Sequence, residues 1–317
     1  MIKSLSEGRS GISESRDGPS EGRVELSEIA EIELFVLKRM RELTLGDHAS
    51  VYKGAGFNFV DLRDWEPGDR PSSIDWAQSS LSNFSPMVSR EYEQNSTSVI
   101  VALADASMST RCGAQGILVA RAIARSVASV GLSALLFQDS FGLVTFDDDF
   151  HELESARPRI GKPHVLHCVD IYQERRDDSE RSRQNVVTAV HAQLRRTAVV
   201  PVISDFLFED PSSLISELAL LNAVHDVFLM MVDVGFAYRL PEVSAGWIEA
   251  FDVETGRERV FSRAELGRLA DRVDVWQEEV AAEARDEGLD VVRVGLDRWA
   301  MENALVEFLA ARRLRKV

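Results

Sequence analysis

The chain has few cysteines, no long apolar run and no apolar N-terminal leader. Cys112 and Cys168 are its two cysteines, and they lack the spacing of zinc ligands or of a disulfide framework. No apolar run approaches the roughly 20 residues that cross a bilayer. The N-terminal segment also lacks the apolar centre of a signal peptide. We therefore expect a cytoplasmic protein that does not insert into a membrane.

Basic residues are also in short supply. The 36 Lys and Arg residues are outnumbered by 52 Asp and Glu residues, which gives a net charge of −16. Nucleic-acid-binding proteins present basic patches, so this balance argues against a nucleic-acid partner and against binding to anionic membrane surfaces. It is compatible with binding a cation or a basic protein.

The common motifs of phosphate binding and nucleophilic catalysis are missing as well. The chain has no G-x-x-x-x-G-K-[ST] loop and no G-x-S-x-G elbow. Its "GAGFNF" segment lacks the full glycine spacing of a dinucleotide loop. A phosphatase of the haloacid dehalogenase type needs an acid two residues after its nucleophile, and Ser107 holds that position after Asp105. The six histidines show no metal-ligand spacing.

Composition along the chain predicts three parts. Residues 1–26 are rich in Ser, Gly, Glu and Arg and should form a disordered tail. Residues 27–97 begin with an amphipathic helix and continue as a small β-rich element interrupted by Gly and Pro. From residue 98 to residue 317, apolar strand-like runs alternate with amphipathic helices.

This alternation predicts an α/β fold with a mostly parallel central sheet and helices on both faces. We expect a helix over 114–130 and a hairpin formed by "LSALLFQD" and "GLVTFDDDF" around Ser140 to Gly142. A second hairpin is expected in "GWIEAFDVETGRERVFS", followed by a long helix over 263–287 and a last helix ending near Arg313.

Polar oxygens gather at the ends of two predicted strands. The run "VIVALADASMST" ends in Asp105, Ser107 and Ser109, and "TAVVPVISD" ends in Ser204 and Asp205. Ligands of such sheets lie beyond the carboxyl ends of the strands. If the two strands are neighbours, these side chains form an all-oxygen set. That set suits Mg²⁺, with Mn²⁺ or Ca²⁺ as alternatives, better than Zn²⁺. The competing interpretation is that Asp105 or Ser109 caps the following helix.

The D-x-S-x-S motif at 105–109 resembles the metal-ion-dependent adhesion site of von Willebrand factor A domains. That resemblance implies a further ligand Asp after a later strand, which Asp205 in "VISDF" matches. It also implies a Thr from a loop before a short helix, and in "QNVVTAVHAQL" the corresponding residue is Asn185. In such sites the open position of the ion accepts a carboxylate from the partner protein.

The segment before this domain is similar to the bacterial domain-of-unknown-function family 58, and the similarity covers roughly residues 45–315. The matching residues are Gly54, Gly56, Phe59, Arg63, Pro67, Gly68, Asp69, Ile74, Asp75 and Trp76. Four polar positions depart from the family pattern, namely Asn58, Arg70, Ser72 and Leu81. We expect Arg63, Asp69, Asp75 and Trp76 to form a buried, hydrogen-bonded brace.

The resemblance implies a function in binding rather than in catalysis. Members of this family are commonly associated with MoxR-type AAA+ ATPases, so the chain is expected to act as a Mg²⁺-dependent, non-enzymatic adaptor in protein assembly or maturation. Two alternatives stay open. One is a metal-dependent hydrolase that uses Asp105 and Asp205, and the other is a metal-free scaffold with a relic site.

Overall fold

The computed structural model describes most of the chain. The described residues are 2–3, 23–45, 58–66, 74–81, 83–93, 98–114, 117–174, 184–235, 247–251 and 258–295. They fall into two compact units, one made of residues 1–40 with 98–317 and the other of residues 41–97.

A six-stranded sheet forms the centre of the larger unit, in the order β13-β10-β9-β4-β7-β8. Neighbouring strands are parallel, except that the edge strand β8 is antiparallel to β7. This confirms the predicted α/β fold with a mostly parallel central sheet, to which the structure adds one antiparallel edge strand. The strands are β4 (Val99–Asp105), β7 (Ser140–Phe146), β8 (Glu152–Arg159), β9 (Val199–Ser204), β10 (Asp226–Val232) and β13 (Asp290–Val294).

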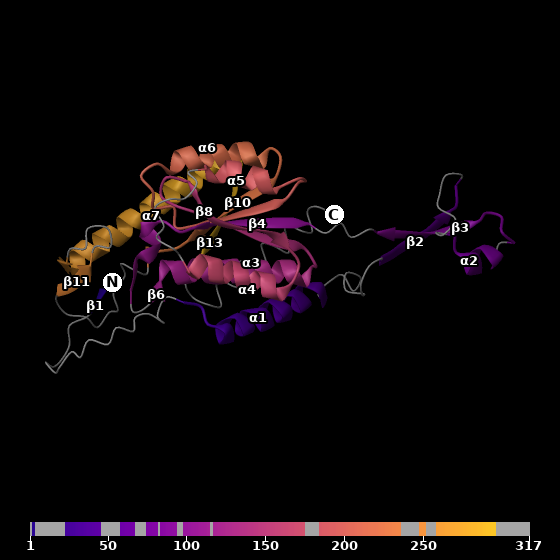
Figure 1. Ribbon diagram of the computed structural model, residues 1–317, viewed down its shortest axis with the longest axis horizontal. Helices are drawn as coiled ribbons and strands as arrows, with labels where there is room; N and C mark the ends of the chain where they lie inside the picture. The colour runs from indigo at the N-terminus through magenta and orange to yellow at the C-terminus, as the bar shows by residue number, and fades with distance from the viewer. Residues whose placement is uncertain are drawn as a thin grey trace. The chain divides into compact units, whose positions relative to one another are not determined.

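Helices cover both faces of this sheet (Figure 1). One face carries α3 (Val119–Leu136) and α4 (Lys162–Gln173), and α1 (Leu26–Leu45) packs against the outer side of these two helices. The other carries α5 (Val186–Gln193), α6 (Pro211–Asn222) and α7 (Arg263–Asp286).

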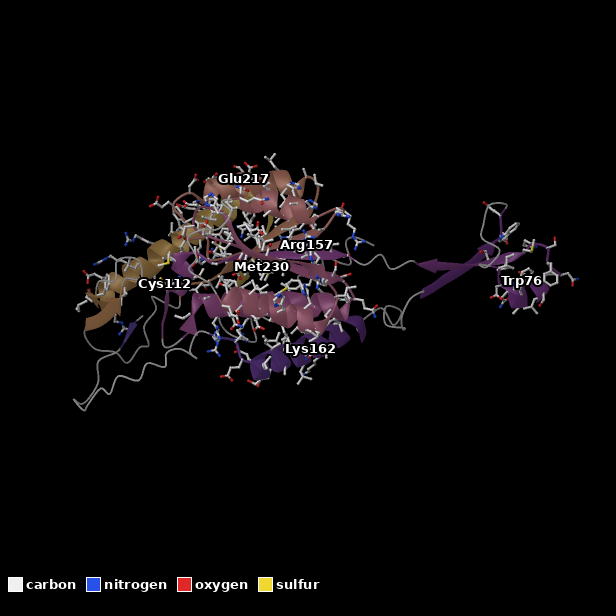
Figure 2. The ribbon with its side chains drawn as sticks, in the orientation of Figure 1. Trp76, Cys112, Arg157, Lys162, Glu217 and Met230 are labelled. Atoms are coloured by element: carbon white, nitrogen blue, oxygen red, sulfur yellow. The ribbon has the colours of Figure 1, made fainter. Side chains whose placement is uncertain are left out.

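The alternation of side chains along β4 creates two separate hydrophobic cores. Ala102 and Ala104 face the core shared with α1, α3 and α4. Val101 and Leu103 face the core shared with α5, α6 and α7. Because successive side chains of a strand point to opposite faces, a strand buried on both faces must be apolar throughout. Met230 of β10 lies in the middle of this layered structure (Figure 2).

A second, five-stranded sheet has the order β12-β11-β1-β5-β6. It contains the predicted hairpin of β11 (Trp247–Phe251) with β12 (Glu258–Ser262). The short strands β5 (Gly113–Ala114) and β6 (Ile117–Leu118) follow the 3₁₀ helix η2 (Met108–Arg111). Strand β1 (Ile2–Lys3) pairs with β11 and β5, so these two residues are not part of a disordered tail. Residues 4–22 and the last predicted helix lie outside the described residues.

Residues 26–40 of α1 belong to the larger unit, although the sequence predicted one part over residues 27–97 that held this helix together with the β-rich element. Ile29, Ile32 and Val36 are buried in the hydrophobic core that also contains residues of α3 and α4. Glu28 forms ion pairs with Arg121 and Arg125 of α3. The amphipathic pattern correctly predicted a helix, but only the tertiary structure shows which surface its apolar face covers.

The predicted hairpin around Ser140 to Gly142 was wrong in its first arm. Residues 132–136 complete α3, and β7 instead pairs with β8 across the turn 147–151. Helix α3 has the length and apolar composition of a membrane-crossing segment, but 72% of it is buried inside the fold. A helix that is buried over most of its surface has only a narrow polar face, so the apolar sequence of its last turns resembled that of a buried strand.

The smaller unit contains the antiparallel strands β2 (Asn58–Asp64) and β3 (Val88–Glu93), with the short helix α2 (Trp76–Leu81). Asp75 is buried, and its Oδ1 accepts hydrogen bonds from the backbone N–H groups of Ala77 and Gln78, so it caps α2. Trp76 is 61% exposed, which does not fit the predicted buried brace. The side chains of Arg63 and Asp69 lie outside the described residues.

Gly142 in β7 provides a test of the sheet edge. A Cβ at this position would lie 2.8 Å from the Ala156 carbonyl oxygen and 2.9 Å from the Pro158 nitrogen, where the β7–β8 register shifts. Because these are backbone atoms, Gly142→Ala should lower the free energy of unfolding by about 1–3 kcal/mol, measured by urea denaturation.

Gly267 is the matched control, since it lies on the exposed face of α7 with no atom within 4 Å of a built Cβ. Gly267→Ala should raise the free energy of unfolding by about 1 kcal/mol, because alanine is the better helix former. If both substitutions stabilised the protein, the close approach of β8 to Gly142 would be refuted.

Candidate metal site at the strand ends

The candidate site lies at the carboxyl ends of the neighbouring strands β4 and β9. Ala104 pairs with Ile203, so the next residues along the two strands, Asp105 and Ser204, lie at the same level of the sheet. Asp205 follows directly. The structure thus fulfils the condition on which the sequence prediction depended, that the two strands are neighbours.

Four adjacent strands end in the same local structure. After β4, β7, β9 and β10 an aspartate Oδ1 accepts a hydrogen bond from the backbone N–H two residues later. This Asx turn reverses the chain without needing glycine. The four residues are Asp105, Asp147, Asp205 and Asp233.

Two of these aspartates differ from the others in burial. Asp105 and Asp205 are both 0% exposed, whereas Asp147 and Asp233 are only half-buried. Turn formation accounts for all four residues, but it does not require the burial of two carboxylates beside each other. Burial of that kind is costly unless something compensates the charge.

A chain of hydrogen bonds connects the predicted ligands. Ser204 Oγ donates to Asp105 Oδ2 at 2.6 Å, and Ser109 Oγ donates to Asp205 Oδ1 at 3.1 Å. The hydroxyls of Ser107 and Ser109 are 2.9 Å apart. Four of the five predicted site residues, Asp105, Ser107, Ser109 and Asp205, are therefore brought together.

One oxygen of this cluster has no hydrogen-bond partner. Asp205 Oδ2 is buried and makes no hydrogen bond within the described part of the chain. Burial, followed by the charge of Asp105, raises the pKa of Asp205 to about 7, although hydrogen bonds from Leu207 and Ser109 oppose the rise. A buried carboxylate oxygen without a donor is rare in folded proteins and indicates a missing partner.

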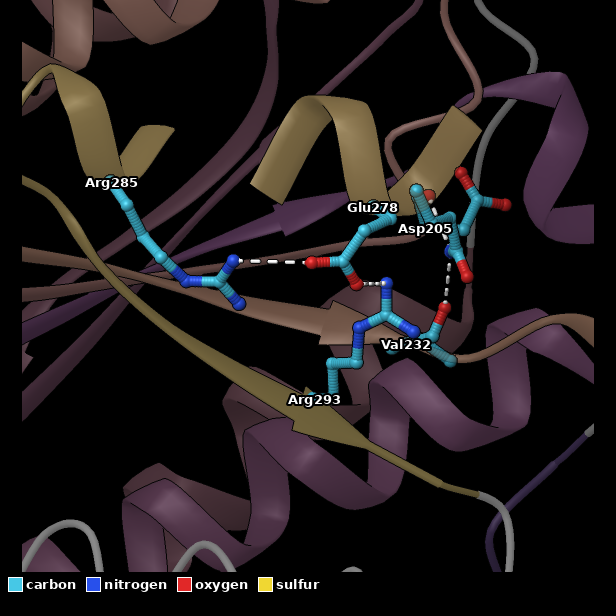
Figure 3. A network of polar contacts seen from close by, with 6 residues as sticks. Asp205, Val232, Glu278, Arg285 and Arg293 are labelled. Atoms are coloured by element: carbon cyan, nitrogen blue, oxygen red, sulfur yellow. Dashed lines mark hydrogen bonds and ion pairs between the residues drawn. The ribbon is translucent and has the colours of Figure 1, made fainter. Parts of the chain in front are cut away.

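Helices on both faces of the sheet hold the backbone of the two site loops. The hydroxyl of Tyr172, on α4, donates to the Asp105 carbonyl at 2.9 Å. From α7, Gln277 Nε2 donates to the carbonyls of Asp205 and Val232 (Figure 3), and Trp276 Nε1 donates to the Phe206 carbonyl. Sequence reasoning missed these residues. A polar Gln277 on the buried face of α7 is the one feature that could have pointed to them.

The backbone just after Asp205 is strained. Phe206 has a φ of 56°, in the left-handed region that side chains other than glycine rarely adopt. Its N–H donates to Ser204 Oγ at 2.8 Å, and its side chain is fully buried. Such strain costs on the order of 1–3 kcal/mol and persists where the surroundings enforce it. Here the hydrogen bond to Ser204 and the buried ring enforce it in the residue that directly follows Asp205.

Asn185, the fifth predicted ligand, takes part in different contacts. Its Oδ1 accepts from the backbone N–H groups of Val187 and Thr188 and so caps α5, and its Nδ2 donates to Glu217 at 2.9 Å. It lies outside the hydrogen-bonded chain of Asp105, Ser107, Ser109 and Asp205. As a ligand, Asn185 would need to share or release its capping contacts.

Asp148, which sequence reasoning missed, approaches the site from the β7–β8 turn. Its Oδ1 accepts from the backbone N–H of Met108 at 3.3 Å, and its carboxylate also bonds the Ser107 hydroxyl. Although Asp148 is an exposed residue, partial burial of its carboxylate raises its pKa above the ordinary value, against the effect of these two hydrogen bonds. The "DDDF" run gave no indication of which aspartate would reach the site.

The chemistry of this cluster fits a hard divalent cation. Two buried carboxylates and two hydroxyls converge, and the unpartnered Asp205 Oδ2 is available as a ligand. Within the described ranges, no group of three or more His, Cys, Asp and Glu side chains is arranged to hold a metal. Any ion here would therefore depend on the serine hydroxyls as well as on the acids.

A protein-family model matches residues 61–278, more than half of the chain, and is described as protein of unknown function DUF58. The chain belongs to the DUF58 family. The matched range includes both strand ends of the candidate site as well as Gln277 of α7. No curated protein matches this DUF58 chain.

Two solved structures resemble this DUF58 protein at low sequence identity. The conserved hypothetical protein BatB from Bacteroides thetaiotaomicron is 18% identical with a TM-score of 0.38, covering 68% of this chain and 98% of its own. An aerotolerance-related membrane protein from Bacteroides fragilis NCTC 9343, with multiple mutations to serines, is 14% identical with a TM-score of 0.39, covering 70% of this chain and 100% of its own.

The raised pKa of Asp205 predicts a pH dependence of stability in the presence of a chelator. The folded protein holds the Asp205 proton more tightly than the unfolded chain, so this stabilisation is complete below about pH 4 and is lost as the pH rises to about 7. The free energy of unfolding of wild type, measured relative to that of Asp205→Asn, should therefore fall from pH 4 to pH 7. Urea denaturation in EDTA measures it, and a difference independent of pH would contradict the shift.

Proposed function

We propose that the strand-end cluster binds Mg²⁺ and, through it, a carboxylate of a partner protein. Asp105, Ser107, Ser109 and Asp205 are the protein ligands in this proposal. The observation that carries it is Asp205 Oδ2, a buried carboxylate oxygen that lacks a hydrogen-bond donor among the described residues. Binding a cation would satisfy this oxygen and offset the repulsion between Asp105 and Asp205.

The chain's own contacts keep the remaining oxygens in place. Asp205 Oδ1 is occupied by the N–H of Leu207 and the hydroxyl of Ser109, which leaves Oδ2 as its free oxygen. Asp105 is fixed by Ser204 Oγ and by the backbone N–H of Ser107. Because Asp205 Oδ1 already accepts two hydrogen bonds, Oδ2 is the Asp205 atom available for coordination. The site is thus preorganised before a ligand enters.

Charge explains why a cation would be needed for binding an acidic group. The chain carries a net charge of −16. Two of its exposed acids, Asp148 and Asp149, lie in the β7–β8 turn beside the site. A partner carboxylate would be repelled by this surface. When bound, Mg²⁺ would supply two positive charges and a coordination position that a partner carboxylate can fill.

The partner we propose is a MoxR-type AAA+ ATPase, with the chain acting as a non-enzymatic adaptor in protein assembly or maturation. This part of the proposal is supported by the family resemblance alone. The metal site and the partner are therefore tested separately.

The metal site is tested by Asp205→Asn. Asparagine keeps the turn through its own Oδ1 but removes the charge and the free carboxylate oxygen, so affinity for Mg²⁺ and Mn²⁺ should fall about tenfold or more. Isothermal titration calorimetry on the full chain measures this. Asp233→Asn is the matched control, because Asp233 makes the same Asx turn at the end of β10.

Asp233→Asn should bind both ions as wild type does. If wild type bound neither ion, the metal-free scaffold alternative would replace the proposal. If the two variants lost affinity equally, the ion would be bound by diffuse negative charge. Metal-dependent hydrolysis of model esters that Asp105→Ala abolishes would favour the hydrolase alternative.

The bridging role is tested by pull-down of a purified MoxR-type ATPase. EDTA should reduce recovery by wild type, and Asp105→Ala should reduce it equally without EDTA. Because AAA+ ATPases also use Mg²⁺ with their nucleotide, EDTA alone does not locate the effect. Asp105→Ala does locate the effect, since it removes metal binding from this chain and leaves the ATPase unchanged. Equal recovery by wild type and variant, with the metal occupancy of wild type measured, would contradict the bridge.

A further inference from the structure

We infer that Asp148 is a positioning residue of the cation site: its carboxylate accepts the hydrogen bond of the Ser107 hydroxyl, so that a lone pair of the Ser107 oxygen faces the ion. The inference rests on the proposed metal site and concerns a residue outside its ligand set. Asp148 lies in the turn between β7 and β8, on a different loop from the predicted ligands.

The contacts of Ser107 show why a proton acceptor is needed. A serine hydroxyl coordinates a cation through its oxygen, so its single proton must be donated elsewhere. Ser107 Oγ has two partners within reach, the Ser109 hydroxyl at 2.9 Å and the Asp148 carboxylate. Once Ser109 Oγ also faces the ion, one of its lone pairs is used there and the nearby cation weakens the other as an acceptor. The Asp148 carboxylate is then the stronger acceptor for the Ser107 hydroxyl.

Ser109 has an acceptor of its own, which makes the arrangement consistent. Its hydroxyl donates to Asp205 Oδ1 at 3.1 Å, leaving Asp205 Oδ2 without a donor among the described residues. Each of the two serine hydroxyls therefore donates its hydrogen bond to one carboxylate. Asp205 serves Ser109 from the β9 loop, and Asp148 serves Ser107 from the β7–β8 turn.

Asp148 is held in this position by the backbone of the loop it serves. Its Oδ1 accepts from the Met108 N–H at 3.3 Å, directly after Ser107 in the chain. The Phe150 N–H bonds the Asp147 carbonyl at 3.0 Å, and the Asp147 side chain accepts from the N–H groups of Asp149 and His151, so the turn itself is ordered by its own contacts. Partners of this kind orient metal ligands, and their removal typically costs 10–100-fold in metal affinity.

Calorimetric titration of the full chain with Mn²⁺ tests the inference. Asp148→Ala should weaken Mn²⁺ binding about 10–100-fold. Asp148→Asn should retain most of the affinity, because its amide oxygen still accepts the Ser107 proton. Asp149→Asn is the matched control, since it removes an equal charge from the same turn and should change the affinity less than about twofold.

A double-mutant cycle separates positioning from charge. In a Ser107→Ala background, Asp148→Ala should cause no further loss of Mn²⁺ affinity, because the residue acts through Ser107. Additive losses, equal losses for Asp148→Asn and Asp148→Ala, or equal losses for the Asp148 and Asp149 variants would overturn the inference.

Two results distinguish failure of the inference from failure of the metal site. Wild-type affinity in Asp148→Ala would refute the role of Asp148 and leave the ion site in place. Absence of Mn²⁺ binding by wild type would refute both. Thermal unfolding of each variant in EDTA, expected to match wild type because Asp148 is exposed, establishes that the variants fold.

Discussion

The structure of the site depends on one electrostatic constraint, the burial of Asp105 and Asp205 side by side at the ends of neighbouring parallel strands. Two carboxylates in this position lose hydration and also repel each other, so the pKa of Asp205 rises to about 7. The hydroxyls of Ser109 and Ser204 and the backbone N–H groups of two Asx turns relieve part of this cost. Asp205 Oδ2 stays without a donor among the described residues, and that position is open to a cation.

The two hydrophobic cores keep this edge of the sheet in place. Tyr172 reaches the Asp105 carbonyl from the helices on one face, and Gln277 reaches the Asp205 carbonyl from the other. Both side chains are buried, so the backbone that carries the acids is fixed by packing as well as by hydrogen bonds. The approach to the site is different in character. It is an exposed acidic turn, where Asp148 can be reached by solvent while its carboxylate contacts the Ser107 loop.

The sequence was informative where chemistry depends on local order. The D-x-S-x-S spacing and the strand-terminal Asp205 correctly predicted which side chains converge, because the carboxyl ends of parallel strands meet at one edge. It was less informative for Asn185, whose amide caps α5 and contacts Glu217. It gave no indication of Asp148, because Asp147, Asp148 and Asp149 are identical in type and only the turn geometry aims one of them at Ser107.

The α/β alternation, the apolar strands and the acids that end them could be predicted from the sequence, since periodicity and strand-terminal residues are local properties. It left open which apolar run was the end of α3 and which was a strand, because fully buried segments of both kinds lack a polar face. The packing of α1 against α3 and α4, and the pairing of β4 with β9, became visible in the three-dimensional structure alone. Only it showed that one carboxylate oxygen of Asp205 is buried without a donor in the described chain. These features depend on contacts between residues far apart in sequence, and such contacts form together when the apolar surfaces of the whole fold are buried.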